Sequence, residues 1–490
     1  MLIAGAGPVG LTMALELARY GVPVRIIDKV PEPTHTSRAV AVWPRTLELL
    51  DRSGAAADII AIGNKVTVAN ILSGGRSVAS LSLDQIPSPY PFALMVPQYE
   101  TEAVLRRHLT AHGVTPDLGV ELLGFEQDED GLSARLREPD GTESIKRFAF
   151  LVACDGAHSV VRHRLGLEFH GDTLGLDWTQ GDFHLSGYPF PSSQMAIFWH
   201  EDGPLLFFPM APDRARIITS LGVSTGAEPV ALEQKAFQKM VEARGPGGIT
   251  LTGTEWVSAF RINERQVENY RSGRVFLAGD AAHIHSPAGG QGMNTGMQDA
   301  INLAWKLALV SHGVASAPAL LESYDLERRP VGAQVIAASG RMTRIGTLPD
   351  HTLQHVRDFI AHILMGLPPV QRAITGLMAE VSIGYPNSPL NGPSLGEVKA
   401  GARVRPVAGV APFGSGNTPV FTACGGSGAA KLASHFPRLV VALACPSGEE
   451  ALLSLVRPDG YLAAAVQDAD WEALIPYLDH LGTERREPII

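Results

Sequence analysis

Cysteine and charge are both scarce in this chain of 490 residues. Its three cysteines, Cys154, Cys424 and Cys445, form no Cys-x-x-Cys pair. We therefore expect neither a disulfide framework nor a zinc site, and we expect a reducing, cytoplasmic location. Charged residues are 18% of the chain, the net charge is −10, and no block of basic residues occurs, so we expect no nucleic-acid partner.

Long apolar runs and a basic leader are also missing. The segment from Met1 to Leu15 is uncharged, but glycine and proline interrupt it and Glu16 and Arg19 follow. It is too short to span a bilayer, so we expect no signal peptide and no membrane partner. The chain is 45% hydrophobic and long enough to need two or three domains.

The first motif lies at the start of the chain. A strand at 2–4, the turn Gly5-x-Gly7-Pro8-Val9-Gly10, a helix at 11–20 ending near Gly21, and a strand at 24–27 are expected in that order. Glycines between a strand and a helix let backbone N–H groups approach a diphosphate. Asp28, followed by Lys29, then ends the second strand, where a carboxylate can accept hydrogen bonds from a ribose.

Two more segments follow apolar runs that resemble buried strands. Residues 148–153 precede Cys154-Asp155-Gly156 and a short stretch ending at Arg162. Residues 274–279 end with Gly279 and are followed by Asp280, and the chain then continues through Pro287, Gly290 and Gly292-Met293-Asn294 into a predicted helix. A helix that begins with glycines presents free backbone N–H groups, so this helix can also face a cofactor.

The remaining pattern indicates further parts of the molecule. We predict a helix at 99–112, alternating β-type segments between 180 and 265 (such as 194–200 and 215–220), and helices from 296 to about 380. The Pro/Gly-rich stretch 385–393 is predicted to be a linker. The last hundred residues alternate strands, at 438–444 and 460–465, with helices.

Taken together and in this order, the three motifs resemble those of the FAD-dependent aromatic hydroxylases, the group A flavoprotein monooxygenases that include phenol and aromatic polyketide hydroxylases. The resemblance implies an α/β fold with a Rossmann-like FAD-binding domain, an inserted antiparallel sheet and a thioredoxin-like C-terminal domain. We expect the FAD domain at 1–175 and 266–385, with 65–95 contributing to the substrate side. The substrate sheet is expected at 176–265 and the thioredoxin-like domain at 394–490.

The resemblance also implies which residues bind FAD. It places Asp155 near the pyrophosphate, Asp280 on the ribityl chain, and the helix that opens at 289–294 near the isoalloxazine ring. It adds Arg38, near the flavin and diphosphate, and Gln98. The full set of expected cofactor residues is Gly5, Gly7, Pro8, Val9, Gly10, Asp28, Lys29, Arg38, Gln98, Asp155, Gly279, Asp280, Pro287, Gly290, Gly292, Met293 and Asn294. For Arg162, contact with the reductant and a purely structural role stay open.

The implied reaction hydroxylates an aromatic substrate with NAD(P)H and O2 through a flavin C4a-hydroperoxide. No second nucleotide motif occurs, so NAD(P)H is expected as a transient co-substrate. Phenol hydroxylase relatives have a catalytic Asp where this chain has Val40, and the catalytic residues stay unassigned. Aromatic and histidine side chains of the inserted sheet are candidates for a substrate pocket or for ordinary sheet packing: His184, Tyr188, Phe198, Trp199, His200, Phe207 and Phe208.

The two histidines beside the third motif do not indicate a metal. His283 and His285 lie two residues apart without a nearby cluster of cysteines or acidic residues, so we expect no metal site.

The activity and the assembly are not fixed by these residues alone. An epoxidase, a Baeyer–Villiger enzyme and a flavin-bound ligand carrier would use the same scaffold, and a homodimer is also open. The spacing of Cys424 and Cys445 excludes a CxxC redox pair, so the C-terminal domain is expected to be structural.

Overall fold

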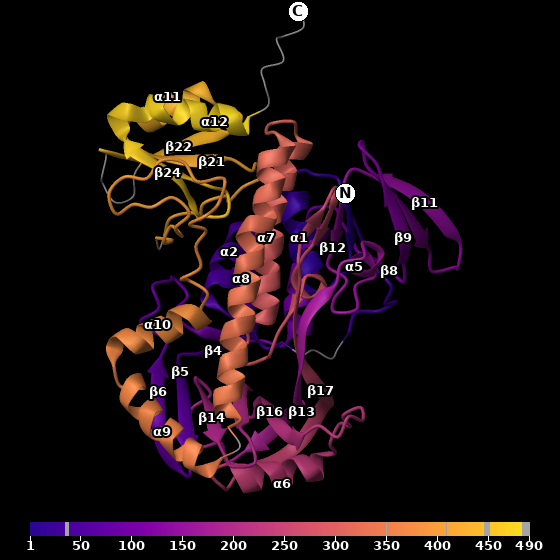
Figure 1. The fold of residues 1–490 in the computed structure, drawn as a ribbon, viewed down its shortest axis with the longest axis vertical. Coiled ribbons are helices and arrows are strands. Elements are labelled where there is room, and N and C mark those ends of the chain that lie inside the picture. The colour runs from indigo at the N-terminus through magenta and orange to yellow at the C-terminus, as the bar shows by residue number, and fades with distance from the viewer. Residues whose placement is uncertain (35–38, 349, 408, 445–450, 483–490) are drawn as a thin grey trace, which may run out of the picture.

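A computed structural model describes residues 1–34, 39–348, 350–407, 409–444 and 451–482. Figure 1 shows one sheet with its helices in the upper half, a second sheet below it, and a C-terminal unit at the upper left. The long helix α8 (Ala317–Gly346) runs beside both sheets and contains Pro330. None of the helices in the described part of the chain is both long and apolar enough to cross a bilayer.

The upper sheet has six strands in the order β18-β19-β12-β1-β2-β8. Every pair in it is parallel except β18 with β19. A parallel sheet covered on both faces needs apolar strands, and the three strands β1, β12 and β19 are buried throughout. The bounds are β1 Leu2–Ala4, β2 Arg25–Asp28, β8 Asp117–Leu118, β12 Leu151–Ala153, β18 Arg271–Ser272 and β19 Val275–Leu277.

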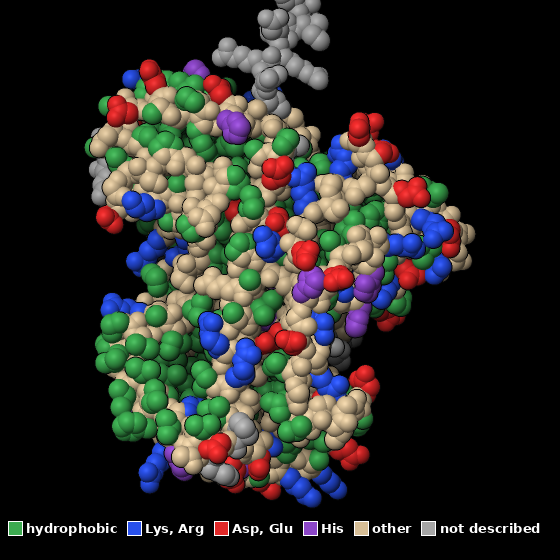
Figure 2. Space-filling view, in the orientation of Figure 1, with side chains coloured by type: hydrophobic (Ala, Val, Ile, Leu, Met, Phe, Trp, Pro, Cys, Tyr) green, Lys and Arg blue, Asp and Glu red, His purple; other side chains and the backbone are tan. Residues whose placement is uncertain are grey.

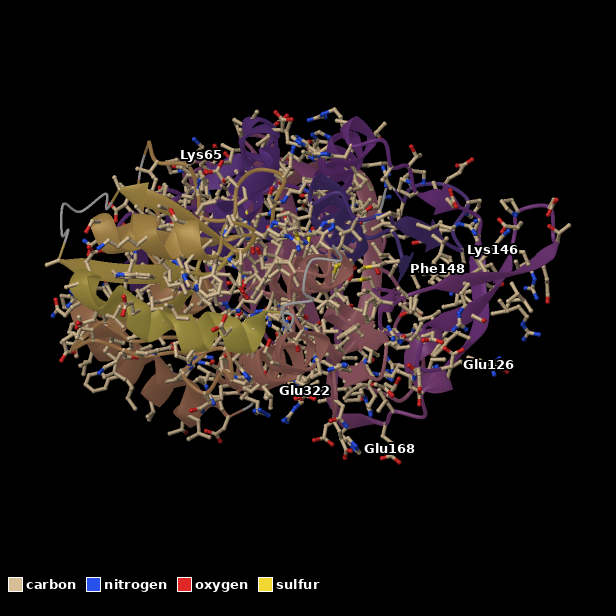
Figure 3. The ribbon with its side chains drawn as sticks, turned by 90° about the horizontal axis from the view of Figure 1, so that it is seen from above. Lys65, Glu126, Lys146, Phe148, Glu168 and Glu322 are labelled. Carbon is tan, nitrogen blue, oxygen red and sulfur yellow. The ribbon has the colours of Figure 1, made fainter. Side chains whose placement is uncertain are left out.

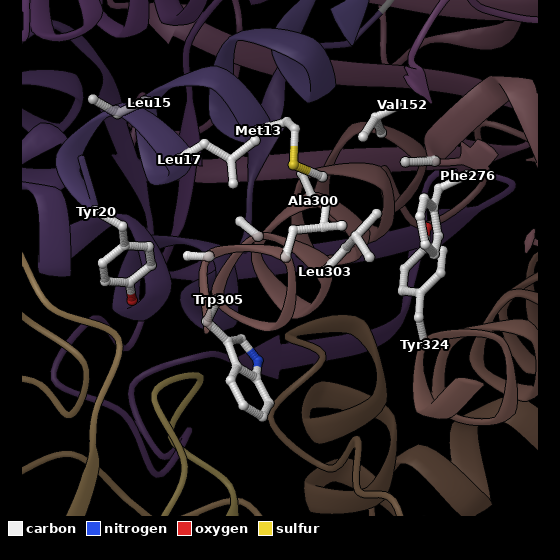
Figure 4. Packing of buried hydrophobic residues seen from close by; sticks show 14 of the residues in the cluster. Met13, Leu15, Leu17, Tyr20, Val152, Phe276, Ala300, Leu303, Trp305 and Tyr324 are labelled. Carbon is white, nitrogen blue, oxygen red and sulfur yellow. The ribbon is translucent and has the colours of Figure 1, made fainter. Parts of the chain in front are cut away.

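Helices α1 and α7 pack against each other beside this sheet. Figure 4 shows Met13 and Leu17 of α1 facing Ala300 and Leu303 of α7. Five helices belong to this half: α1 Pro8–Arg19, α2 Pro44–Leu50, α3 Ala55–Ile62, α4 Gln98–Ala111 and α7 Gly292–Ser311, with the short α5 Val160–Arg164 and the 3₁₀ turns η1 Asp51–Ser53 and η2 Gly279–Ala281.

The lower sheet has eight strands in the order β20-β17-β13-β16-β15-β14-β5-β6. It is antiparallel except where β14 runs parallel to β5. The long strands β13 Phe169–Ser186 and β17 Thr250–Val267 link it to the upper half. The others are β5 Val68–Ser73, β6 Arg76–Ser82, β14 Gln194–Trp199, β15 Leu205–Ala211, β16 Arg214–Val223 and β20 His283–Ile284.

Helices cover this lower sheet from two sides. Helix α6 (Gln234–Arg244) packs Phe237 and Val241 onto one face, while α9 (His351–Met365) lies against β6 and is followed by α10 (Pro368–Met378). A small antiparallel sheet, β3 Ala41–Val42, β7 Ala93–Met95 and β4 Asn64–Val66, lies between the two halves. A further three-stranded sheet, β9 Glu121–Gln127, β10 Leu132–Arg137 and β11 Glu143–Phe148, lies at the periphery, where Figure 3 labels Glu126 and Lys146.

The C-terminal unit is a four-stranded sheet in the order β22-β21-β23-β24. Strands β21 and β22 are parallel and joined by α11, and β23 and β24 form an antiparallel hairpin. The bounds are β21 Phe421–Gly425, α11 Ser427–His435, β22 Val440–Ala444, β23 Leu452–Val456, β24 Leu462–Gln467, η3 Asp468–Leu474 and α12 Ile475–Leu481. The thioredoxin-like assignment stays a prediction, and Cys445 lies outside the described residues.

Three sequence expectations need adjusting. The predicted strand 148–153 is divided: Phe148 ends β11, where it pairs with Leu132, and β12 begins at Leu151. The first helix begins at Pro8, because proline at the first helical position needs no N–H partner. The predicted linker is not a loose connection, since Tyr385 and Leu390 are buried.

Candidate active site

The three sequence motifs meet at the carboxyl edge of four adjacent parallel strands. Backbone hydrogen bonds join them in series: Gly5 N donates to Ile27 O (2.8 Å), Cys154 N to Ala4 O (2.7 Å), and Ala278 N to Ala153 O (2.9 Å). Ligands of open α/β sheets bind at this edge. The tertiary structure therefore brings together segments that are more than a hundred residues apart in sequence.

The three glycines of the first turn have different roles. A Cβ atom built on Gly5 would lie 2.2 Å from Cys154 O, and one on Gly10 would lie 1.9 Å from Gly5 O. These two glycines are needed for close backbone packing. A Cβ on Gly7 would meet no atom of the described residues within 4 Å, its chain neighbours aside. Gly7 is the N-cap of α1, whose first turn holds no acidic residue, so an open, electropositive helix end faces that space.

The other residues expected to bind FAD near this turn differ in their contacts with it. Asp28 Oδ2 accepts a hydrogen bond from Ala6 N (2.8 Å) and Oδ1 accepts one from Val30 N (2.9 Å). Its carboxylate therefore shapes the turn and keeps lone pairs for another donor. Lys29 is exposed, and Gln98 is the first residue of α4, where its Nε2 donates to Glu102. Arg38 lies outside the described residues.

The second motif forms the beginning of α5. Asp155 Oδ2 accepts hydrogen bonds from Val160 N (2.8 Å) and Val161 N (3.3 Å). Arg162 is buried: it donates to Ala281 O and Ala157 O, and its guanidinium lies 4.1 Å from the Phe169 ring centroid. These contacts support the structural role of Arg162, as a brace between α5 and η2.

The third motif is held by a buried carboxylate. Asp280 is exposed on η2, and the turn itself is anchored by Asp299 of α7. Asp299 Oδ2 accepts from Gly279 N (3.0 Å) and contacts His283 Nε2 (2.8 Å), while Oδ1 accepts from Arg328 Nε (2.7 Å). Burial opposes the charge, but Arg328 and His283 keep the pKa of Asp299 below its ordinary value. His283 thus belongs to the buried group of side chains that contact Asp299.

The loop from His285 to Gln291 leads into α7, and Asn294 lies in the first turn of that helix. Asn294 is fully buried and its amide is occupied by protein: Oδ1 accepts from Trp43 N (2.8 Å) and Nδ2 donates to Ala41 O and Gly290 O. Only its backbone is left for a cofactor. Pro287, Gly290 and Gly292 are partly exposed, and Met293 is buried at the first turn of α7.

His285 in the same loop carries an unused acceptor. Its Nδ1 lies 2.7 Å from Ser286 O, so Nδ1 holds the proton and Nε2 has a free lone pair. Nε2 is buried and has no partner among the described residues. Burial lowers the pKa of His285 to about 4, which keeps the ring neutral at physiological pH.

The candidate substrate residues divide between the two faces of the lower sheet. Tyr188, Phe198 and Phe207 pack with the α6 side, and His184 and His200 lie at the surface. Trp199 stacks under Arg357. Only Phe208 joins the opposite cluster, which contains Trp43 and five methionines in or against it: Met95, Met195, Met210, Met365 and Met378. Trp43 Nε1 donates to Gly289 O (2.8 Å), so this cluster adjoins the α7 loop.

The roles of several side chains were not predicted from the sequence, where Asp299 was noted only as part of the third motif. Asp299 and Arg328 hold η2, and Glu380, buried and at φ 59°, accepts from Thr295 Oγ1 (2.7 Å) and Gln298. The helical spacing of polar residues on α7 could have indicated Asp299. Nothing local to the sequence shows that Arg216 of β16 pairs with Asp182 of β13, because that contact comes from strand pairing.

One surface hollow among the described residues lies elsewhere. It is lined by Phe150, Arg271, Arg274 and residues 127–129. Phe150 and Arg274 directly precede β12 and β19, so this hollow is at the amino edge of the sheet, opposite the three motifs. It is therefore not the cofactor site.

Comparison with known proteins agrees with this geometry. The FAD binding domain family model matches residues 1–339. The chain belongs to this family. It is 38% identical to a 6-methylpretetramide 4-monooxygenase of Streptomyces rimosus over 80% of this chain and 70% of that protein. It is 34% identical to an aromatic compound monooxygenase of Bacillus subtilis over 81% and 80%.

A solved structure extends the likeness to nearly the whole chain. The OxyS anhydrotetracycline hydroxylase from Streptomyces rimosus matches with a TM-score of 0.79 and 29% identity, covering 98% of each chain. The chain is therefore an FAD-dependent aromatic monooxygenase. The carboxyl edge fits FAD, because the described residues leave space next to Gly7 and the first turn of the adjoining helix holds no acidic side chain.

Proposed function

We propose that this monooxygenase hydroxylates a phenolic, fused-ring aromatic substrate with NAD(P)H and O2, and that FAD lies along the carboxyl edge of the upper sheet. The observation that carries the proposal is the meeting of Gly5–Gly10, Asp155 and Gly279–Asp280 at one edge. The proposed cofactor residues are those expected from the sequence, with Asn294 contributing its backbone.

In this arrangement each segment has a separate task. The N-terminus of α1 stabilises the diphosphate, and Asp28 accepts from the adenosine ribose. The N-terminus of α7 points its N–H groups and its positive end toward the flavin ring, where they favour the reduced, anionic form. Bound FAD, reduced by NAD(P)H, supplies the reaction with O2; the protein positions the aromatic ring and excludes water.

The methionine cluster beside Trp43 supports a large apolar substrate. Methionine side chains are flexible and polarisable and pack against irregular aromatic surfaces. Met95, Met195 and Met210 are buried here, with Phe208 packed against them. The names of the relatives, 6-methylpretetramide and anhydrotetracycline enzymes, also point to fused-ring substrates for this chain.

We propose His285 Nε2 as the acceptor for a substrate hydroxyl. Val40, at the position of the phenol hydroxylase carboxylate, is buried and cannot accept a proton. His285 Nε2 is buried, fixed in the acceptor tautomer by Ser286 O, and located in the loop between η2 and α7. Such an acceptor orients a phenol and draws electron density into its ring.

The experiment is a screen of phenols and fused-ring phenolics for stimulation of NAD(P)H oxidation by the FAD-loaded protein, with product mass spectrometry. We expect stimulated oxidation and a product with one added oxygen atom. Ring expansion would instead identify a Baeyer–Villiger enzyme. If the protein binds FAD but no aromatic compound stimulates NAD(P)H oxidation, the result would indicate a flavin-bound ligand carrier. His285→Phe should lower the stimulated rate while leaving FAD binding unchanged.

We also propose a homodimer through α9 and the start of α10. Figure 2 shows apolar side chains gathered over these helices. Seven side chains there are between 46% and 67% exposed: Leu353, Val356, Phe359, Ile360, Ile363, Leu364 and Leu367. A contiguous exposed apolar face of this kind is typical of an interaction surface, and a standard dimer buries roughly 800 Å² on each partner. Light scattering should show a dimer that Phe359→Ser dissociates. A monomer at all concentrations, or one that binds lipid vesicles through this face, would overturn it.

A further inference from the structure

A continuous path of buried side chains connects the cofactor turn η2 with the C-terminal unit. It begins at Gly279 N, which donates to Asp299 Oδ2 (3.0 Å). Asp299 Oδ1 accepts from Arg328 Nε (2.7 Å), and Arg328 Nη1 donates to Tyr385 Oη (3.1 Å). Asp299 and Arg328 have no exposed side-chain surface. The path therefore crosses from η2 through α7 and α8 to residue 385 without contact with solvent.

The path continues into the β23–β24 hairpin. The ring of Tyr385 packs on Tyr461 with centroids 4.3 Å apart. Arg457 lies over both rings and pairs with Glu327, which precedes Arg328 on α8, at 2.6 Å and 2.9 Å. The hairpin therefore binds α8 at Glu327. The next residue, Arg328, donates to the Asp299 carboxylate, which accepts the hydrogen bond from η2.

Side chains in such a path can move little independently. Arg328 uses all three guanidinium nitrogens, with Nη2 donating to Thr295 O (3.0 Å) in the first turn of α7. A shift of Tyr385 therefore changes the position of Arg328, which contacts both the anchor of η2 and the start of α7. Both of these segments face FAD in the proposed site.

From this geometry we infer that Tyr385 and Arg328 are positioning residues for FAD, and that docking of the C-terminal unit and FAD binding stabilise each other. The inference rests on the proposed location of FAD at η2 and α7. Coupling of this kind is reciprocal: whatever strengthens the docking of the hairpin strengthens FAD binding, and bound FAD protects the hairpin.

The test compares two variants that each remove one phenolic hydroxyl. Tyr385→Phe removes the acceptor of Arg328 Nη1 and keeps the ring on Tyr461. Tyr477→Phe is the matched control, because Tyr477 Oη donates to Leu390 O (2.8 Å) and also joins the C-terminal unit to the segment 385–393. It contacts neither Arg328 nor Asp299 in any hydrogen bond that the structure shows.

Two measurements are made on the full-length apoprotein with and without FAD: the Kd for FAD by fluorescence, and hydrogen exchange of residues 452–467. We expect FAD to slow exchange in β23 and β24 of the wild type. Tyr385→Phe should weaken FAD binding about five-fold and lose most of this FAD-dependent protection, while Tyr477→Phe should keep both.

Three results would overturn the inference. One is wild-type protein that binds FAD without any change of exchange in β23 and β24. Another is a Tyr385→Phe variant that matches Tyr477→Phe in both measurements. If Tyr385→Phe does not fold, hydrogen exchange of the wild type with and without FAD is the measurement that tests the coupling. Wild-type protein that takes up no FAD would overturn the proposed cofactor site, and the inference with it.

Discussion

At the scale of single residues, we expect a substitution at Gly7 to affect FAD binding and a substitution at Gly10 to affect folding. The backbone of Gly7 (φ −74°) accepts alanine, and its Cβ would enter the free space at the end of α1. Gly7→Ala should leave apoprotein melting unchanged and weaken FAD binding at least about ten-fold, or 1.4 kcal/mol. Gly10→Ala, whose Cβ would overlap Gly5 O, should destabilise the apoprotein. Gly7→Ala protein with wild-type FAD affinity would contradict the proposed diphosphate position.

Glu380 is predicted to make stability depend on pH. Burial raises its pKa to about 7, above the ordinary value of 4.5. Between these values the unfolded chain has lost this proton and the folded protein keeps it, so stability falls as pH rises from about 5 to 7. The loss is on the order of 3 kcal/mol, from about 1.4 kcal/mol per pKa unit.

Glu380→Gln removes that titration and keeps an acceptor for Thr295. Urea unfolding at pH 5 and pH 8 should show the variant gaining stability relative to the wild type at the higher pH. Glu126→Gln, at an exposed position on β9, is the control and should differ from the wild type equally at both pH values. The same difference at both pH values for Glu380→Gln would refute the raised pKa.

At the scale of elements, the lower sheet is tied to the site by one buried ion pair. Arg216 of β16 and Asp182 of β13 pair at 2.7 Å and 2.8 Å with no exposed side-chain surface, and Arg216 Nη1 donates to Ala39 O (2.9 Å). Trp256 Nε1 donates to the same carboxylate (2.8 Å). The sheet thereby holds the segment that leads into β3.

Asp182→Asn would leave Arg216 buried without a counter-charge. We expect a loss of about 3–5 kcal/mol in the free energy of unfolding. Asp177→Asn is the matched control, because Asp177 pairs with Arg261 at 2.7 Å in the same sheet with both side chains partly exposed. Its loss in denaturant titrations should be much smaller. Equal losses would show that burial of the first pair carries no extra cost.

At the scale of the whole molecule, the C-terminal unit is joined to the FAD-binding half by buried charges. Arg457 pairs with Glu327 and Asp459, Arg52 donates to Pro458 O, and Arg45 donates to Asp459 O. Removal of residues 394–490 would take away the partners of Arg45, Arg52 and Glu327 in residues 457–459. We expect such a truncation to yield no folded protein.

Arg457→Met tests the same interface by a single change. It leaves Glu327 and Asp459 without their shared cation, so the melting temperature should fall by several degrees. Arg438→Met, at an exposed arginine that donates to His312 O (3.3 Å), removes another contact between the unit and α7 and should have little effect. Similar losses for both variants would show that the buried pairs are not what fastens the unit.

The local sequence determined the glycine turn and the first strands. Gly5, Gly7, Gly10 and Pro8 specify their turn because each meets a local steric requirement, and the apolar runs beside them can only be buried. The order of three such motifs was enough to indicate FAD and the family. The structure confirms the α/β architecture and the comparisons confirm the cofactor.

Only the tertiary structure decided which side chains hold the cofactor turn in place. Asp299, Arg328 and Tyr385 are far apart in sequence, and their pairing depends on how α7, α8 and the C-terminal hairpin pack. Likewise, Phe207 and Phe208 have the same local pattern, yet alternation along β15 sends them to opposite faces. Local pattern sets which residues are buried, but long-range packing sets their partners.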